Sequence, residues 1–204
     1  MLKVLEKCQF VKSVYKLEEA DMPLLPEIVL AGRSNAGKSS LINALTGRNS
    51  LAKVSRKQGK TQAVNYFQVN DMETKFYLTD LPGYGYSAAG RDKQAEFSSL
   101  TDNYLESERP FACILVLLDI RHLPTNMDMA MLQWLDFKGL PYAILLNKAD
   151  KLSRAEQQKA LQAIRRVLPD YAQQQALFIV SSLQKETLEP LLSYIRKIVA
   201  DCNL

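Results

Sequence analysis

The sequence predicts an α/β fold of three layers, with a mostly parallel six-stranded sheet between two layers of helices. Six runs of strand length recur along the chain, and four of them are continuously apolar, as expected for parallel strands covered on both faces. Most runs are followed by segments with helical spacing, which implies right-handed crossovers between parallel strands. The runs are 27–32, 63–69, 75–81, 111–119, 141–147 and 176–182.

Local patterns place the individual elements. The run at 63–69 mixes polar and apolar residues, so we expect it to be one antiparallel strand at the edge of the sheet. Ser153 and Glu156 have the spacing of a capping box, which predicts a helix that begins just after Ser153. Apolar residues at helical spacing between Leu188 and Val199 predict a closing helix.

Length and composition indicate one ordinary globular domain. The chain has 204 residues, of which 47% are hydrophobic and 24% charged, as in average soluble proteins. We assign residues 25–204 to the domain and expect residues 1–24 to pack on it as an extension. No apolar run is long enough to span a bilayer, and three cysteines without paired spacing fit a reducing cytoplasm. We therefore expect a cytoplasmic monomer without a membrane partner.

A phosphate-binding loop follows the first apolar run. Its pattern G-x-x-x-x-G-K-[ST] stands between a predicted strand and a predicted helix, where backbone N–H groups and the helix dipole favour an anion. Lys38 would supply a mobile charge for the outer phosphates, and the Ser39 hydroxyl a ligand for Mg²⁺. The predicted phosphate-binding residues are Gly32, Arg33, Ser34, Asn35, Ala36, Gly37, Lys38, Ser39 and Ser40.

The tetrapeptide NKAD predicts guanine as the base. It follows the run at 141–147, at the strand end where open α/β sheets bind ligands. The Asp150 carboxylate can accept hydrogen bonds from guanine N1–H and the 2-amino group, neither of which adenine offers, and such sites reject the wrong ligand by roughly 10⁴-fold. Asn147 would contact guanine N7 or brace the loop, and Lys148 would cover the base. Ala149 completes the tetrapeptide. Position alone adds Val180, Ser181 and Ser182, and we expect backbone N–H groups of residues 181–183 to face the guanine carbonyl oxygen.

A magnesium and switch element is predicted at the D-x-x-G spacing of Asp80 and Gly83. Asp80 would hold Mg²⁺ through water, and the Gly83 N–H would reach the γ-phosphate, so that loss of this phosphate releases the following loop. Thr61 is the expected second hydroxyl ligand. The predicted metal ligands are thus Ser39, Thr61 and Asp80, and the predicted catalytic residues are Lys38, Thr61 and Gly83. Further predicted contacts are Gly59, Lys60, Gln62, Ala63, Leu81 and Pro82.

Taken together, the motifs GRSNAGKSSLINAL, GKTQ, DLPGYGY, DIRH and NKAD resemble those of the EngB family (YihA, YsxC) of translation-factor-related GTP-binding proteins. The resemblance covers about residues 25–200 and departs at Asn147, where the family more usually has threonine. It implies a Ras-like P-loop GTPase domain that uses Mg²⁺ and hydrolyses GTP slowly to GDP. It also implies the large ribosomal subunit and its rRNA as partners, and defects of cell division and septation on loss.

Two residues make the hydrolytic site unusual. Tyr84 follows the D-x-x-G glycine, where many Ras-like enzymes have a glutamine that orients the attacking water, so we expect slow hydrolysis until a partner completes the site. Asn35 can hold a potassium ion beside the phosphates, as in related GTPases, and this charge would replace an arginine finger. A hydrogen bond within the loop is the equal alternative for Asn35.

Other interpretations stay open. Residues 47–62 carry five basic residues and no acid, which suits either a solvated loop or one that faces RNA. An RNA-binding assembly module, whose affinity is gated by nucleotide while hydrolysis is incidental, is therefore an alternative to a GTPase switch. A P-loop ATPase or kinase is a third, which Asp150 disfavours. The single histidine, His122, is near no phosphate motif in the sequence and is interpreted as structural.

Overall fold

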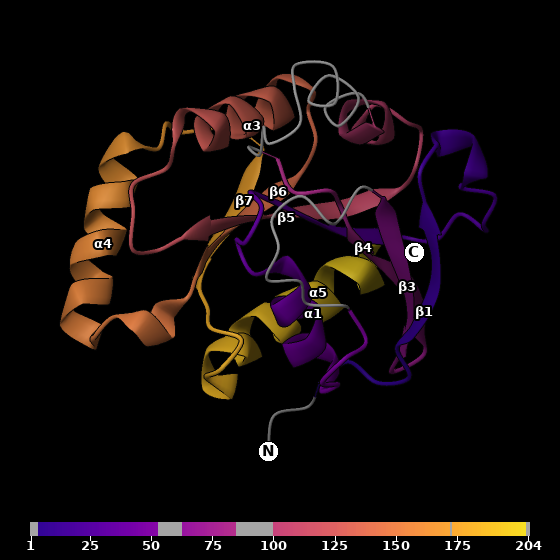
Figure 1. Ribbon diagram of the computed structural model, residues 1–204, viewed down its shortest axis with the longest axis horizontal. Coiled ribbons are helices and arrows are strands. Elements are labelled where there is room, and N and C mark those ends of the chain that lie inside the picture. The colour runs from indigo at the N-terminus through magenta and orange to yellow at the C-terminus, as the bar shows by residue number, and fades with distance from the viewer. Residues whose placement is uncertain (1–3, 53–62, 85–99, 172, 203–204) are drawn as a thin grey trace.

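The computed structural model describes residues 4–52, 63–84, 100–171 and 173–202, which form a seven-stranded sheet between two layers of helices (Figure 1). The strand order is β1-β3-β4-β2-β5-β6-β7, with parallel pairing from β4 to β7 and antiparallel pairing of β1 with β3 and of β3 with β4. The strands are β1 (Gln9–Val14), β2 (Glu27–Gly32), β3 (Val64–Asp71), β4 (Thr74–Asp80), β5 (Phe111–Asp119), β6 (Tyr142–Asn147) and β7 (Gln174–Ile179).

The helices begin close to the predicted positions. Ser153 caps its helix by accepting a hydrogen bond from the Glu156 N–H, with the capping box complete as predicted. The predicted closing helix is also present, and Pro190 occupies its first turn, where a missing N–H costs nothing. The helices are α1 (Lys38–Thr46), α3 (Asn126–Phe137), α4 (Arg154–Val167) and α5 (Glu189–Asp201), with helical residues also at 100–105 and short 3₁₀ helices at Leu17–Glu19, Ala149–Lys151 and Lys185–Leu188.

The prediction of six strands is wrong by one, because β1 was missed. In β1 only Val14 is buried, whereas Phe10 and Val11 are exposed, so the strand shows no apolar run. It pairs antiparallel with β3 and forms the edge of the sheet. As a result β3 is antiparallel, as predicted, but lies inside the sheet between β1 and β4.

The apolar runs in the central strands reflect two separate cores. In β2, Ile28 packs into the cluster beneath α1 and α5, and its neighbour Val29 packs into the cluster beneath α3 and α4. Figure 1 shows these helix pairs on opposite faces of the sheet. Each fully buried aliphatic side chain of this kind stabilises the fold by about 1.5–3 kcal/mol.

This topology brings the predicted motifs together. Four adjacent parallel strands, in the order β4-β2-β5-β6, end at Asp80, Gly32, Asp119 and Asn147. Because the carboxyl ends of parallel strands meet at one edge of a sheet, the phosphate loop, the D-x-x-G turn and NKAD share that edge.

Candidate functional site

The phosphate loop leads from β2 directly into α1, which begins at Lys38. Gly37 precedes the helix with φ of 100°, a backbone conformation that favours glycine. A Cβ at this position would lie 2.4 Å from Nδ2 of Asn147, so the close approach of NKAD to the loop also requires glycine here.

Lys38, Ser39 and Asp80 form a compact charged group behind the loop. The Lys38 ammonium donates to the Gly32 carbonyl oxygen at 3.0 Å, and the Ser39 hydroxyl donates to Asp80 Oδ2 at 3.3 Å. Burial lowers the pKa of Lys38 and raises the pKa of Asp80, while attraction between the two opposes both shifts. Each charge is therefore poorly compensated and suited to a ligand of opposite charge.

The oxygen atoms of Ser39 and Asp80 fit a magnesium ion. Asp80 Oδ1 is buried and has no hydrogen-bond partner in the described part of the chain. Hydroxyl and carboxylate oxygens are the hard ligands that Mg²⁺ takes, and Mg²⁺ commonly keeps water and phosphate oxygens as its remaining ligands. The described residues contain no cluster of three or more His, Cys, Asp or Glu side chains that could hold a metal, and a site of this kind does not require one.

The D-x-x-G turn packs on the phosphate loop. The Ser34 N–H donates to the Tyr84 carbonyl oxygen at 3.1 Å, and Arg33 and Tyr84 form an isolated parallel bridge. A Cβ at Gly83 would lie 2.7 Å from the Ser34 nitrogen, so this approach excludes a side chain at that position. The turn therefore extends the pairing of β2 with β4 beyond the ends of both strands.

Tyr84 also contacts the start of α3, a relationship that sequence reasoning missed. Its hydroxyl donates to Asp128 Oδ1 at 3.0 Å, and burial together with the Asp128 charge raises the pKa of Tyr84 well above its ordinary value. Asp128 belongs to a capping box with Thr125. The T-x-x-D spacing could have revealed the cap, but no local pattern indicates a partner 44 residues away.

Asn147 braces the phosphate loop, which is one of its two expected roles. Its Nδ2 donates to the Ala36 carbonyl oxygen at 2.8 Å, and the side chain is almost fully buried. The contact with guanine N7 stays a prediction.

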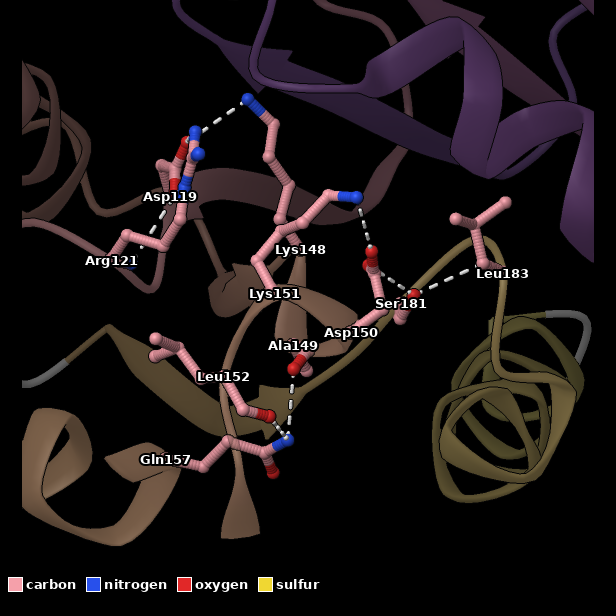
Figure 2. Close-up of polar contacts among 10 residues, drawn as sticks. All are labelled: Asp119, Arg121, Lys148, Ala149, Asp150, Lys151, Leu152, Gln157, Ser181 and Leu183. Carbon is pink, nitrogen blue, oxygen red and sulfur yellow. Dashed lines mark hydrogen bonds and ion pairs between the residues drawn. The ribbon is translucent and has the colours of Figure 1, made fainter. Parts of the chain in front are cut away.

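The Lys148 side chain forms an ion pair with Asp119, at the end of β5 (Figure 2). Its ammonium lies 2.9 Å from Asp119 Oδ2, and Arg121 binds the same carboxylate through two nitrogens at 2.8 and 2.7 Å. Burial acts to raise the pKa of Asp119, but the hydrogen bonds from Arg121 and Lys148 outweigh it and hold the pKa well below its usual range. The ion pair fixes one end of the Lys148 side chain, whose methylenes would cover the base.

Asp150 is oriented by Ser181 and Lys151 (Figure 2). The Ser181 hydroxyl donates to Asp150 Oδ1 at 2.7 Å, and the Lys151 ammonium lies 3.1 Å from Oδ2. Burial raises the pKa of Asp150, but these contacts outweigh it and lower the pKa, so the group is a carboxylate at neutral pH. Sequence reasoning placed Ser181 near the base by position only and missed its bond to Asp150.

The backbone N–H of Ser181 is not free for a ligand. It donates to the Thr187 hydroxyl at 2.9 Å, while the Leu183 N–H donates to the Ser181 hydroxyl at 3.1 Å. The expected backbone contact with the guanine carbonyl oxygen therefore stays a prediction for Ser182. Val180 is tied to NKAD, because its carbonyl oxygen accepts from the Ala149 N–H at 3.1 Å.

Four predicted residues lie outside the described part of the chain: Gly59, Lys60, Thr61 and Gln62. The described residue Ala63 is buried just before β3, and Leu81 and Pro82 are buried in the D-x-x-G turn. The second hydroxyl ligand of Mg²⁺ thus stays a prediction.

A cavity of about 430 Å³ adjoins the outer side of the phosphate loop. It is lined by residues 33–36, by the end of β5, by residues 122–125, and by Asp128 and Lys148. His122 is among these residues, so the structure brings the histidine closer to the phosphate loop than its sequence neighbours indicated.

The fold and this site define a P-loop GTPase. A family model described as "50S ribosome-binding GTPase" matches residues 27–148. A probable GTP-binding protein EngB from Petrotoga mobilis (strain DSM 10674 / SJ95) is 38% identical over 195 residues, which cover 96% of this chain and 97% of that protein. A protein of the same name from Clostridioides difficile (strain 630) is 40% identical, over 82% of this chain and 80% of that protein. The chain belongs to the EngB family of GTP-binding proteins.

Solved structures agree on the fold. A probable GTP-binding protein engB superposes with a TM-score of 0.66 at 20% identity and covers 86% of this chain and 99% of its own. Era in complex with MgGDPNP and nucleotides 1506–1542 of 16S ribosomal RNA superposes with a TM-score of 0.67 at 21% identity, over 85% of this chain and 57% of its own. The resemblance to EngB and the Ras-like fold are thus confirmed, and the family has GTPase activity. No helix in the described residues is long and apolar enough to cross a membrane.

Proposed function

We propose that this GTPase is a nucleotide-dependent switch in assembly of the large ribosomal subunit. The observation that carries the proposal is the packing of the D-x-x-G turn on the phosphate loop, because Gly83 there lies against Ser34 and can sense a γ-phosphate. The family model described as a 50S ribosome-binding GTPase supports the choice of subunit. Loss of the protein would then impair cell division and septation as consequences of failed assembly.

In the proposed site, each residue type has one role. The loop N–H groups and Lys38 bind the phosphates, Asp150 reads guanine, and the Gly83 N–H meets the γ-phosphate. Ser39, Thr61 and Asp80 hold Mg²⁺, which neutralises charge on the phosphates when it is bound. Asn35 is an exposed residue with a φ of 65° in the loop, and its side chain has no hydrogen bond to another described residue. We propose that Asn35 binds a potassium ion in addition to the Mg²⁺ ion of the site.

Slow hydrolysis without a partner follows from Tyr84. Its hydroxyl donates a hydrogen bond to Asp128 at the start of α3 and therefore does not orient the attacking water. Since no glutamine stands at this position to orient water, a partner has to complete the site. A turnover of many per second by the isolated protein would refute this part of the proposal.

Co-sedimentation with ribosomal subunits tests the switch. The protein is mixed with purified large or small subunits in GDP or in a non-hydrolysable GTP analogue. We expect binding to the large subunit in the analogue, and at least about tenfold weaker binding in GDP, a difference of about 1.4 kcal/mol. Binding that is equal in both nucleotides, or that favours the small subunit, would contradict the proposal. RNA affinity that falls steeply with salt, with hydrolysis dispensable for assembly, would favour the RNA-binding module instead.

A further inference from the structure

Tyr84 is held at two points that belong to different elements. Its carbonyl oxygen accepts from the Ser34 N–H of the phosphate loop at 3.1 Å. Its hydroxyl donates to Asp128 Oδ1 at the start of α3, at 3.0 Å. One residue therefore joins the phosphate loop to the start of α3.

Asp128 is a rigid anchor for this contact. Its Oδ2 atom accepts from the Thr125 N–H at 2.9 Å and from the Thr125 hydroxyl at 2.7 Å, which leaves Oδ1 for Tyr84. The side chain is only 5% exposed, so it has little freedom to turn away. The raised pKa of Tyr84 keeps its hydroxyl protonated, and therefore a donor, at physiological pH.

Gly83 lies between two residues that are each held by hydrogen bonds, Leu81 and Tyr84. On one side, the Leu81 N–H donates to the Leu30 carbonyl oxygen at 3.1 Å. On the other side stands Tyr84 with its two bonds, and Gly83 itself lies too close to Ser34 to carry a side chain. The Ser34 hydroxyl also donates to the Gly83 carbonyl oxygen at 3.4 Å, so the position of the Gly83 N–H depends on Ser34 and on Tyr84.

We propose that Tyr84 and Asp128 form a latch that positions Gly83 for the γ-phosphate of GTP. The proposal rests on the γ-phosphate contact assigned to Gly83 above. A turn that is held before the ligand arrives loses less conformational entropy on binding, so its contact contributes more to affinity. Only GTP gains from this, because GDP has no γ-phosphate, and the latch thereby raises the preference for GTP over GDP.

The test is Tyr84→Phe, which removes only the hydroxyl. Dissociation constants for GDP and for a non-hydrolysable GTP analogue are measured in Mg²⁺ with the full chain. We expect affinity for the analogue to fall about tenfold, as for loss of one hydrogen bond to a charged group, while affinity for GDP changes less than about twofold. Tyr15→Phe makes the same chemical change at an exposed tyrosine and should leave both constants unchanged.

A double-mutant cycle assigns the effect to the pair. Tyr84→Phe should lower the ratio of analogue to GDP affinity when Asp128 is present and have no such effect in an Asp128→Ala background. Thermal unfolding confirms that each variant is folded, and if Asp128→Ala does not fold, Tyr84→Phe alone decides. Unchanged or stronger analogue binding in Tyr84→Phe would overturn the latch, and so would an equal loss for both nucleotides.

Gly83→Ala separates the latch from the contact on which it rests. If the analogue binds Gly83→Ala as well as the wild type, the γ-phosphate contact is wrong and the latch has nothing to position. If Gly83→Ala loses affinity for the analogue but keeps its affinity for GDP, while Tyr84→Phe loses neither, the contact stands and only the latch fails.

Discussion

Asn147 donates a hydrogen bond from Nδ2 to the carbonyl oxygen of Ala36, a residue 111 positions earlier in the chain. The bond joins NKAD to the phosphate loop, and Gly37 leaves the room for it. NKAD and the phosphate loop are therefore joined directly, and a change at one should affect ligand binding at the other.

The first prediction concerns this brace. Asn147→Asp keeps the size of the side chain, removes the donor and places a negative charge beside the Ala36 carbonyl oxygen. Because a buried group left without its partner costs about 1–3 kcal/mol, we expect affinities for GDP and GTP to fall together by about ten- to a hundredfold. Isothermal titration with GDP measures the effect. Asn126→Asp, an exposed position at the start of α3, is the control, and a loss confined to GTP would contradict the prediction.

The second prediction concerns Asp150 and the identity of the base. Asp150→Asn replaces an acceptor of two hydrogen bonds with a group that also donates, which suits xanthine because xanthine has a carbonyl where guanine has its 2-amino group. We expect GDP affinity to fall at least about 100-fold and xanthosine diphosphate to become the better ligand. Competition against a fluorescent nucleotide measures both constants.

Its control is Asp170→Asn, the same change at an exposed carboxylate. If Asp150→Asn kept its preference for guanine, Asp150 would not read the base. Binding of ATP by the wild type at comparable affinity would lead to the same conclusion.

The elements that sequence reasoning found are those whose signal is local. Runs of strand length, four of them continuously apolar, identified the five parallel strands, and the Ser153 capping box located the start of α4. Strand β1 escaped because an edge strand buries little: its apolar residues Phe10 and Val11 face solvent, and only pairing with β3 defines it.

In the site, too, local patterns were predictable from the sequence and contacts between distant residues were not. The order of P-loop, D-x-x-G and NKAD along the chain was sufficient to predict that these motifs meet, because parallel strands end at one edge. The bonds of Ser181 to Asp150 and of Tyr84 to Asp128 could not be predicted, since each joins residues 31 or more positions apart without a spacing rule.

The third prediction concerns potassium. If Asn35 holds K⁺ beside the phosphates, GTP hydrolysis should be at least about tenfold faster in potassium than in sodium at equal ionic strength, because the added charge stabilises the transition state by about 1.4 kcal/mol or more. The measurement is phosphate release under single-turnover conditions. Asn35→Asp serves as the comparison. We expect the ratio of its hydrolysis rates in potassium and in sodium to differ from the ratio of the wild type. Equal rates of the wild type in both salts would remove potassium from the mechanism.

The last prediction concerns pH and the carboxylate of Asp119. Its pKa is held below the usual range by Arg121 and Lys148, so the folded state favours the ionised form more than the unfolded state does. This contribution to stability is present above the unfolded pKa, near 3.9, and is lost as the pH falls below it. Asp119→Asn should therefore lower the melting temperature at pH 7 by about 2 °C, the effect of roughly 1 kcal/mol or less for a partly exposed ion pair in a chain of this size. The difference in melting temperature between wild type and Asp119→Asn should shrink as the pH is lowered below about 4. Thermal unfolding at a series of pH values measures it. A difference that stays constant below about pH 4 would mean that Asp119 stabilises the fold by packing and not by charge.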